Sequence, residues 1–221
     1  MDVIFVKQGE YVRGDEAFPV LAGLVKEFLE LSGRHDIDVS AVTQDVIRRT
    51  PEGRPCCCIS GAPDISVTHS DDLWMCLVSD ERCGLDFQYM REQYIPGVVE
   101  RFYTEGEREY IEGGGTGQFT GSFLRTEEGR VGRFFDVWVR REALGKYDGH
   151  GFFGNYPDSA PGGILADSVY FIRENTVESR QVYMHEITPG MLKSAGIKPE
   201  AGFRAAAVTR SDELPLIKAL H

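Results

Sequence analysis

Three apolar runs follow one another in the first half of the sequence, and they constrain the fold more than any other feature. In residues 64–70, Ile65 and Val67 alternate with polar side chains, which predicts a strand with one buried face. Residues 73–79 are apolar on both faces, as expected of a central strand. Residues 83–88 form a third run after a tight turn. Together the three runs predict an antiparallel meander.

The remaining sequence also mixes strand and helix patterns. Residues 2–7 predict a strand, and residues 15–33 place apolar side chains at helical spacing before a stop at Gly33. We expect further helices in residues 96–112 and 134–152, Gly-rich or polar loops in residues 113–132 and 154–163, and strands in residues 168–174, 180–187 and 203–209. Because helix and strands recur in each half, we predict an α+β protein with two similar half-domains, residues 1–88 and 89–221.

Charge and hydropathy exclude several classes of protein. The formal net charge of -11 argues against a non-specific nucleic-acid or membrane-surface binder. No apolar run approaches the roughly 20 residues of a membrane helix. The first apolar run is short and follows an acidic residue, which does not fit a signal peptide. We therefore expect a cytoplasmic protein with no nucleic-acid or membrane partner.

The five cysteines are Cys56, Cys57, Cys58, Cys76 and Cys83, and no two of them form a Cys-x-x-Cys motif. Adjacent side chains on a strand point to opposite faces, so the first three cannot converge on one ion. We interpret all five as reduced, mostly buried thiols.

The predicted helix in residues 134–152 carries the first candidate site. At 3.6 residues per turn, Trp138, Glu142 and Lys146 lie near one face. Glutamate four residues before lysine is the favourable order for a surface ion pair. However, a face that carries tryptophan is usually buried, and a carboxylate drawn inward needs a cation or a metal ion. Both interpretations, a surface pair and an active site, follow from the pattern.

Three polar residues in the first half are further candidates. His69 ends one predicted strand, and it is either a hydrogen-bonded structural residue or a ligand contact. Asp86 stands between two apolar residues, and it is either a turn cap or a functional acid. Arg54 lies between glycine and proline, where a solvated turn is the simplest explanation. The Gly-rich loop lacks Gly-Lys-Ser/Thr, so it is not a phosphate loop.

Several short motifs occur in a fixed order along the chain. They are Gly-Arg-Pro at 53–55, Val-Thr-His-Ser at 67–70, Gly-Leu-Asp-Phe-Gln at 84–88, Arg-Phe-Tyr-x-x-x-Glu-Arg at 101–108 and Trp-x-x-Arg-Glu-Ala-x-x-Lys-x-x-Gly-x-Gly-Phe at 138–152. As a set, they resemble the 4′-phosphopantetheinyl transferases, in particular the longer, surfactin-synthetase-activating type. The resemblance covers residues 53–152, and residues 202–208 are also similar to the last strand of that family.

The resemblance implies a fold and a reaction. The fold would be two similar α+β half-domains related by a pseudo-twofold axis, which makes the monomer an internal pseudo-dimer. The enzyme would move the 4′-phosphopantetheine group of coenzyme A onto a serine of an acyl or peptidyl carrier protein. The reaction would depend on Mg²⁺, and the other product would be adenosine 3′,5′-bisphosphate.

The resemblance also implies residue roles. Asp86 and Glu142 would hold Mg²⁺, a hard cation suited to carboxylates. Glu142 would also be the base for the carrier serine, and Lys146 would stabilise the departing phosphate. Thr68 and His69 match a Ser-His pair that contacts coenzyme A phosphates. Arg54 matches a lysine that contacts the 3′-phosphate, and arginine keeps that charge.

The sequence departs from the family pattern at Gln88, where many members have a third acid. A neutral amide is a weaker ligand for Mg²⁺ than a carboxylate. The loop of residues 112–132 lies where a carrier protein would dock, and Arg125, Arg130 and Arg133 are candidate contacts. Further basic contacts for coenzyme A are harder to assign, with Lys26 and Arg48 as candidates.

Two alternative functions remain open. The first is a non-catalytic coenzyme A or carrier-protein binding protein of the same fold that lost turnover with the third acid. The second is an unrelated metal-dependent phosphohydrolase that uses His69, Asp86 and Glu142 and needs no carrier protein.

Overall fold

The computed structural model describes residues 1–91, 95–113, 127–152, 168–172, 179–199 and 202–220. Within these residues lie two four-stranded sheets, a two-stranded ribbon and five α-helices, which confirms the predicted α+β class. None of the described helices is both long enough and apolar enough to cross a membrane.

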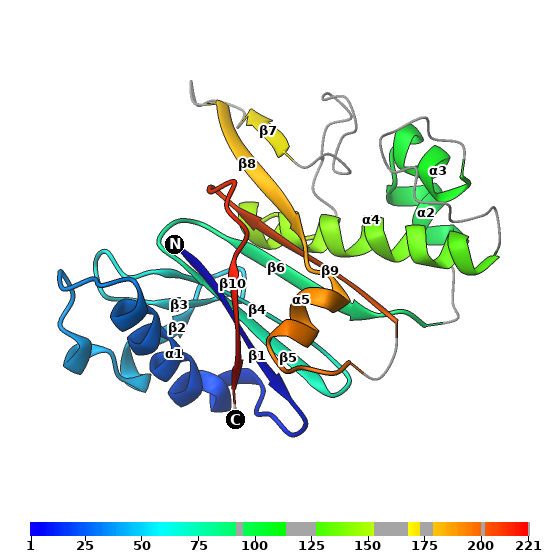
Figure 1. Cartoon of the computed structure of the whole chain (residues 1–221). Helices are drawn as coiled ribbons and strands as arrows, with labels where there is room; N and C mark the ends of the chain where they lie inside the picture. The colour runs from blue at the N-terminus through cyan, green and yellow to red at the C-terminus, as the bar shows by residue number, and fades with distance from the viewer. Residues whose placement is uncertain (92–94, 114–126, 153–167, 173–178, 200–201, 221) are drawn as a thin grey trace.

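The first sheet has the strand order β10-β1-β5-β4. Its strands are β10 (Leu216–Leu220), β1 (Asp2–Gln8), β5 (Leu73–Ser79) and β4 (Asp64–Ser70). β5 is a central strand and is buried along its whole length, as its apolar pattern predicts. Helix α1 (Phe18–Leu31) covers one face, after a 3₁₀ turn at Gly14–Ala17 and beside the ribbon β2 (Ile47–Arg49) and β3 (Pro55–Cys57) (Figure 1).

The second sheet has the strand order β6-β9-β8-β7. Its strands are β6 (Gly84–Tyr89), β9 (Phe203–Thr209), β8 (Ser179–Glu186) and β7 (Ser168–Ile172). Helix α4 (Glu127–Asp148) lies across this sheet, with α2 (Pro96–Phe102) and α3 (Glu105–Ile111) near one end of it, and α5 (Pro189–Ser194) links β8 to β9 (Figure 1). The predicted three-stranded meander is therefore wrong in its last step, because β6 pairs with β9 and not with β5.

Side-chain alternation divides the apolar side chains into three cores, one between each pair of neighbouring layers. On β1, Val3 and Phe5 face α1, whereas Ile4 and Val6 face the other way. The second set joins apolar side chains of β5, β6 and β9 in a core that both sheets share. A third core lies between the second sheet and α4. The order of layers is therefore α1, first sheet, second sheet, α4.

Three strands of each sheet follow the same order of connections, whereas the fourth strand, β10 or β7, is placed differently. In the first, β1 leads through α1 to β4 and β5, and β5 pairs antiparallel with both β1 and β4. In the second, β6 leads through α4 to β8 and β9, and β9 pairs antiparallel with both β6 and β8. Strands β4 and β6, which are edge strands of the two sheets, run side by side (Figure 1).

Other expectations differ from the structure. The end of the expected loop 113–132 is helical because α4 begins at Glu127, and residues 114–126 lie outside the described residues. Only Cys76 and Cys83 are buried, whereas Cys58 is exposed, so the thiols are not mostly buried. Strand β10 was not anticipated; it pairs parallel with β1.

Candidate functional site

The site begins where β6 touches the C-terminal half of α4. A Cβ atom on Gly84 would lie only 2.0 Å from the carbonyl oxygen of Ala143, so only glycine allows this approach. The side chains of Asp86 and Gln88, on the same face of β6 as Gly84, consequently lie on the α4 side. This contact brings Asp86 within reach of the helix.

Lys146 on α4 bonds across to β6. Its Nζ donates to Asp86 Oδ1 at 2.7 Å and to the carbonyl oxygen of Leu85 at 3.0 Å. It makes no ion pair with Glu142, and among the described residues Glu142 has no hydrogen-bond partner. The pair within the helix, which the spacing favours, is therefore not formed. The lysine instead ties α4 to the strand that carries Asp86.

Asp86 is buried, and its two oxygens differ. Oδ1 accepts from Lys146 and, at 3.0 Å, from the Thr68 hydroxyl of β4. Oδ2 accepts no hydrogen bond from the described residues, yet it is not fully enclosed. One carboxylate oxygen is thus committed to the protein, and the other is available to a ligand.

Glu142 is half-buried, one helical turn before Lys146. Burial raises the pKa of Glu142, the negative charge of Asp86 raises it further, and Lys146 opposes the change. A raised pKa brings a carboxylate closer to the range in which it accepts a proton efficiently at neutral pH.

These two carboxylates fit a hard divalent cation. Their mutual repulsion and the free Oδ2 of Asp86 mark a place where positive charge would be stabilising. No group of three or more histidine, cysteine or acidic side chains suited to a metal occurs in the described part of the chain. Gln88 donates its amide N–H to Ser70 and to the carbonyl oxygen of Tyr89, both at 3.2 Å.

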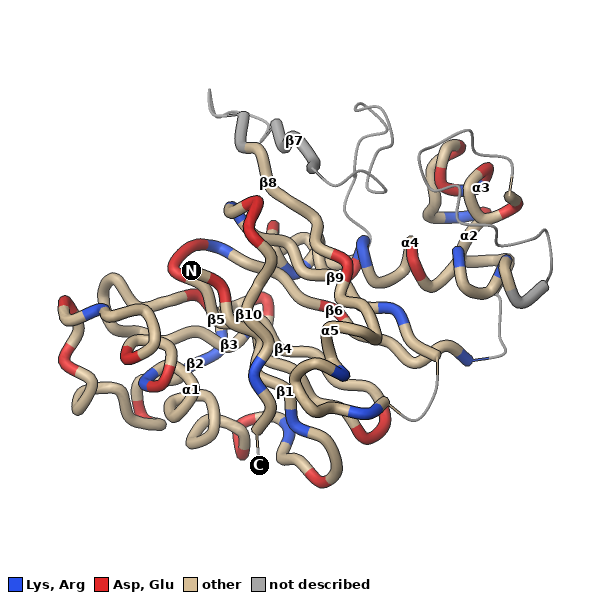
Figure 2. The backbone as a smooth tube through the Cα atoms, viewed as in Figure 1, with Lys and Arg blue, Asp and Glu red and all other residues tan. Residues whose placement is uncertain are grey.

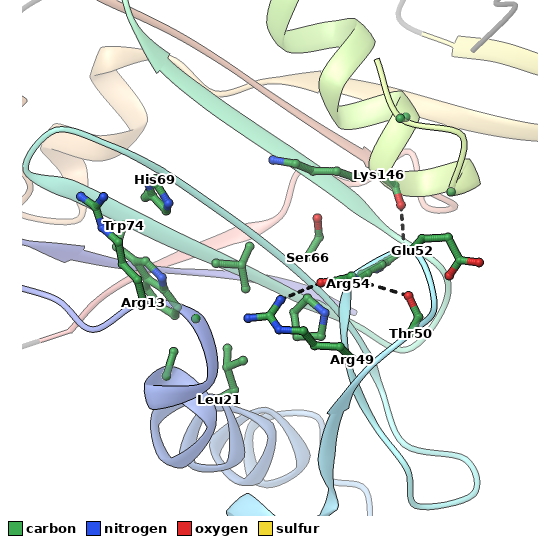
Figure 3. A pocket seen from close by; sticks show the side chains of 18 of the residues that line it. Arg13, Leu21, Arg49, Thr50, Glu52, Arg54, Ser66, His69, Trp74 and Lys146 are labelled. Carbon is green, nitrogen blue, oxygen red and sulfur yellow. Dashed lines mark hydrogen bonds between the residues drawn. The ribbon is translucent and has the colours of Figure 1, made fainter. Parts of the chain in front are cut away.

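A cavity of about 360 Å³ opens beside this cluster (Figure 3). Its lining comes from the 3₁₀ turn at Gly14–Ala17, α1, the β2–β3 ribbon, β4 and the end of α4. Basic side chains dominate the charges of the lining: Arg13, Arg49, Arg54, Arg82 and Lys146, against the single acid Glu52. Such a lining suits a ligand with several negative charges.

Arg54 lines the cavity, but most of its guanidinium is bound to the protein. Nη1 donates to the carbonyl oxygen of Lys146 at 2.7 Å, and Nε donates to that of Ile65 at 3.0 Å. Nη2 pairs with Asp64 and also donates to the carbonyl oxygen of Cys83 at 2.8 Å. Arg54 therefore links β4, the start of β6 and the end of α4.

Thr68 and His69 are adjacent on β4 and point to opposite faces. Thr68 is buried toward β6, whereas His69 is exposed toward α1, where its ring lies 5.8 Å from that of Tyr11. Figure 3 shows His69 near Arg13 and Trp74 at one end of the cavity. Partial burial, then Arg13 and Lys146, lower the pKa of His69, so the free protein favours neutral imidazole.

Three of the basic cavity residues were not anticipated from the sequence. Arg49 lines the cavity although its neighbour Arg48 was the candidate, because successive strand residues face opposite ways. Arg13 and Arg82 also line it, and neither forms an ion pair with a described acid. Lys26 instead lies in a separate depression on α1.

Glycines shape the wall of the cavity at the end of α4. A Cβ atom on Gly145 would lie 2.4 Å from the backbone of Gly151, so the chain folds back tightly against the helix. Gly149 and Gly151 both have positive φ, and both donate to the carbonyl oxygen of Gly145. The Gly-x-Gly motif thus closes the helix beside Lys146.

The candidate docking arginines lie near α3 and α4. Arg130 donates to Glu112 at 2.9 Å, and Arg133 donates to the carbonyl oxygen of Ile111 at 2.8 Å. Arg125 lies outside the described residues.

No protein-family model matches this chain, and a search of curated proteins finds no match either.

Proposed function

We propose that the protein is a 4′-phosphopantetheinyl transferase, which moves the phosphopantetheine group of coenzyme A onto a serine of an acyl or peptidyl carrier protein. The observation that carries the proposal is the meeting of Asp86, Glu142 and Lys146 beside a basic cavity. The motif order, which resembles that family, is the second support.

The reaction needs a nucleophile activated at a pyrophosphate. The carrier serine oxygen attacks the phosphorus that bears the pantetheine arm and forms a new O–P bond. The bond from that phosphorus to the bridging oxygen breaks, and the bridging oxygen leaves with adenosine 3′,5′-bisphosphate. Glu142 accepts the serine proton, for which its raised pKa is suited.

Lys146 acts on the phosphate that leaves. An ammonium has three N–H donors, and Lys146 uses them on Leu85 and Asp86 with one to spare. That donor stabilises the negative charge that grows on the bridging oxygen. Mg²⁺, held by Asp86 Oδ2 and Glu142, would neutralise the pyrophosphate.

The cavity would bind the nucleotide part of coenzyme A. Arg13, Arg49 and Arg82 have N–H donors for its phosphates. Arg54 adds the N–H group that its hydrogen bonds within the protein leave unused. His69 would gain a proton when the anion binds, because a negative charge nearby stabilises imidazolium.

The repeated strand order supports two half-domains around a pseudo-twofold axis, with the site between them. β4 of the first half carries Thr68, and β6 and α4 carry the acids and Lys146. A cleft of this kind gives the pyrophosphate access to residues of both halves.

The alternatives differ in their support. A non-catalytic binding protein gains support from Gln88, whose amide is bonded to Ser70 and Tyr89. The phosphohydrolase loses support, because His69 faces α1 whereas Asp86 faces α4, and the three residues form no metal-binding group in the described chain.

The test is incubation with coenzyme A, Mg²⁺ and a panel of apo carrier proteins, followed by intact mass measurement. The expected result is the gain of one phosphopantetheine group on at least one carrier protein, prevented by a chelator. Binding of coenzyme A without a mass gain on any carrier would favour the binding protein, and free phosphate released without a carrier would favour a hydrolase.

A further inference from the structure

Side-chain hydroxyls join the two sheets where their edge strands meet. On β4, every second residue carries a buried hydroxyl, and each accepts a backbone N–H of β6. The pairs are Ser66 with Leu85 at 2.9 Å, Thr68 with Phe87 at 3.2 Å, and Ser70 with Tyr89 at 3.2 Å. We call these six residues the hydroxyl seam.

Thr68 differs from the other two seam hydroxyls because it also donates its own hydrogen to a bond across the seam. Its hydroxyl hydrogen can go to Asp86 Oδ1 at 3.0 Å or to the carbonyl oxygen of Phe87 at 3.5 Å. A hydroxyl has only one hydrogen, and the shorter contact to a charged acceptor is the stronger bond. Thr68 thus accepts from β6 and donates to Asp86 at the same time.

Two donors from different elements therefore fix the same oxygen of Asp86. Lys146 approaches from α4 and Thr68 from β4, both on Oδ1. Lysine is a point charge on a flexible stem and sets direction poorly. The Thr68 hydroxyl is held by the Phe87 N–H and is 5% exposed as a residue, so it is the more rigid of the two.

We infer that Thr68 is a positioning residue, which orients Asp86 so that Oδ2 is presented to the ligand. Thr68 is buried, and its hydroxyl is bonded to the Phe87 N–H and to Asp86, so its single hydrogen serves Asp86 and not a coenzyme A phosphate. The meaning of Oδ2 as a metal ligand rests on the proposed function; the orientation of Asp86 does not. Residues that orient a metal ligand typically change metal affinity about 10- to 100-fold when replaced.

The variants separate positioning from seam stability. Thr68→Val removes the hydroxyl and keeps the shape, and Thr68→Ser restores a hydroxyl. Ser70→Ala is the matched control, because it removes the seam bond to Tyr89, together with the Gln88 contact, and Ser70 makes no bond to Asp86. Thr68→Ala replaces the valine variant if the latter does not fold.

The first measurement needs no ligand. Hα–Hβ coupling constants of Asp86 by NMR should show one χ1 rotamer in the wild type, Thr68→Ser and Ser70→Ala, and averaged rotamers in Thr68→Val. An Asp86 rotamer that stays fixed in Thr68→Val overturns the inference, whatever reaction the protein catalyses.

The second measurement is a calorimetric Mg²⁺ titration in the presence of coenzyme A, with transfer kinetics. Thr68→Val should weaken Mg²⁺ binding about 10- to 100-fold and lower kcat, with the KM for coenzyme A unchanged. Thr68→Ser should recover both. A raised KM with normal kcat and Mg²⁺ affinity would instead make Thr68 a phosphate contact. If no wild-type transfer occurs but the rotamer result holds, the proposed function fails and the positioning of Asp86 stands.

Discussion

Glu142 is a carboxyl group whose charged form is disfavoured by folding. The pKa of Glu142 is raised in the folded protein, so folding favours the protonated carboxyl group. The stability that comes with this protonated form is fully present below the unfolded pKa of about 4.3 and is lost as the pH rises through the folded pKa. We therefore predict that Glu142→Gln raises the free energy of unfolding at pH 7 and changes it little at pH 3.5. Urea unfolding at both pH values measures this. Equal effects at the two pH values would contradict a raised pKa, and the same variant should have lost transfer.

Arg54 and Arg13 line one cavity but differ in what they bind. Arg54 pairs with Asp64 with only 9% of its side chain exposed, and breaking a buried pair typically costs about 3–5 kcal/mol. Arg13 has no acidic partner among the described residues. We predict that Arg54→Ala lowers stability by an amount of this order, whereas Arg13→Ala keeps stability and weakens coenzyme A binding. Thermal unfolding and calorimetry on both variants measure this. If Arg13→Ala lowers stability while Arg54→Ala only weakens coenzyme A binding, Arg54 is not a structural link.

The contact between β6 and α4 determines the spacing of the site at the scale of elements. A Cβ atom at residue 84 would meet backbone and not a flexible side chain, so α4 must move. We predict that Gly84→Ala costs at least about 1–3 kcal/mol and separates Lys146 from Asp86, which lowers transfer more than coenzyme A binding.

Gly23→Ala is the matched control for that change. Gly23 is exposed in α1, and a Cβ atom there would meet nothing within 4 Å. The control should gain about 1 kcal/mol from helix propensity. Denaturant unfolding of both variants checks the pair, and a Gly84→Ala protein as stable and active as the wild type would show that the close approach is not needed.

Element types were predictable where the local pattern is strong, and pairing was not. The alternation in β4 and the apolar run of β5 gave both strands directly. β6 was assigned to the wrong neighbour because its partner, β9, lies far along the chain and no local pattern specifies it. Strand β10 escaped prediction because it is short, follows Pro215 directly and is interrupted by Lys218.

The candidate site shows the same division. Glu142 stood out because tryptophan lies on its helix face, and Asp86 because apolar residues flank it. Arg13 and Arg82 lie in exposed turns whose sequences do not differ from solvated ones, so only the folded chain brings them to the cavity.

Net charge governs the approach of a partner at the scale of the whole molecule. The chain carries -11, and its acidic and basic residues are interspersed over the described backbone (Figure 2). An acidic carrier protein would be repelled at long range, and salt screens that repulsion over about 10 Å at 0.1 M. We predict that the association rate rises or barely changes between low and moderate salt. Stopped-flow binding measures this, and a steep fall with salt would show that a basic surface directs docking.

The central claim is that Asp86 and Glu142 serve phosphopantetheine transfer. Its most direct test is single-turnover transfer from labelled coenzyme A to an apo carrier protein, with the wild type, Asp86→Asn and Glu142→Gln compared in parallel. The account predicts label on the carrier serine in step with adenosine 3′,5′-bisphosphate in the wild type. It also predicts that the transfer rate falls at least about 10²-fold in each variant, which is the usual effect of removing a proton-transfer group or a residue that supports it. Wild-type protein that binds coenzyme A but labels no carrier, or variants that transfer at the wild-type rate, would contradict it.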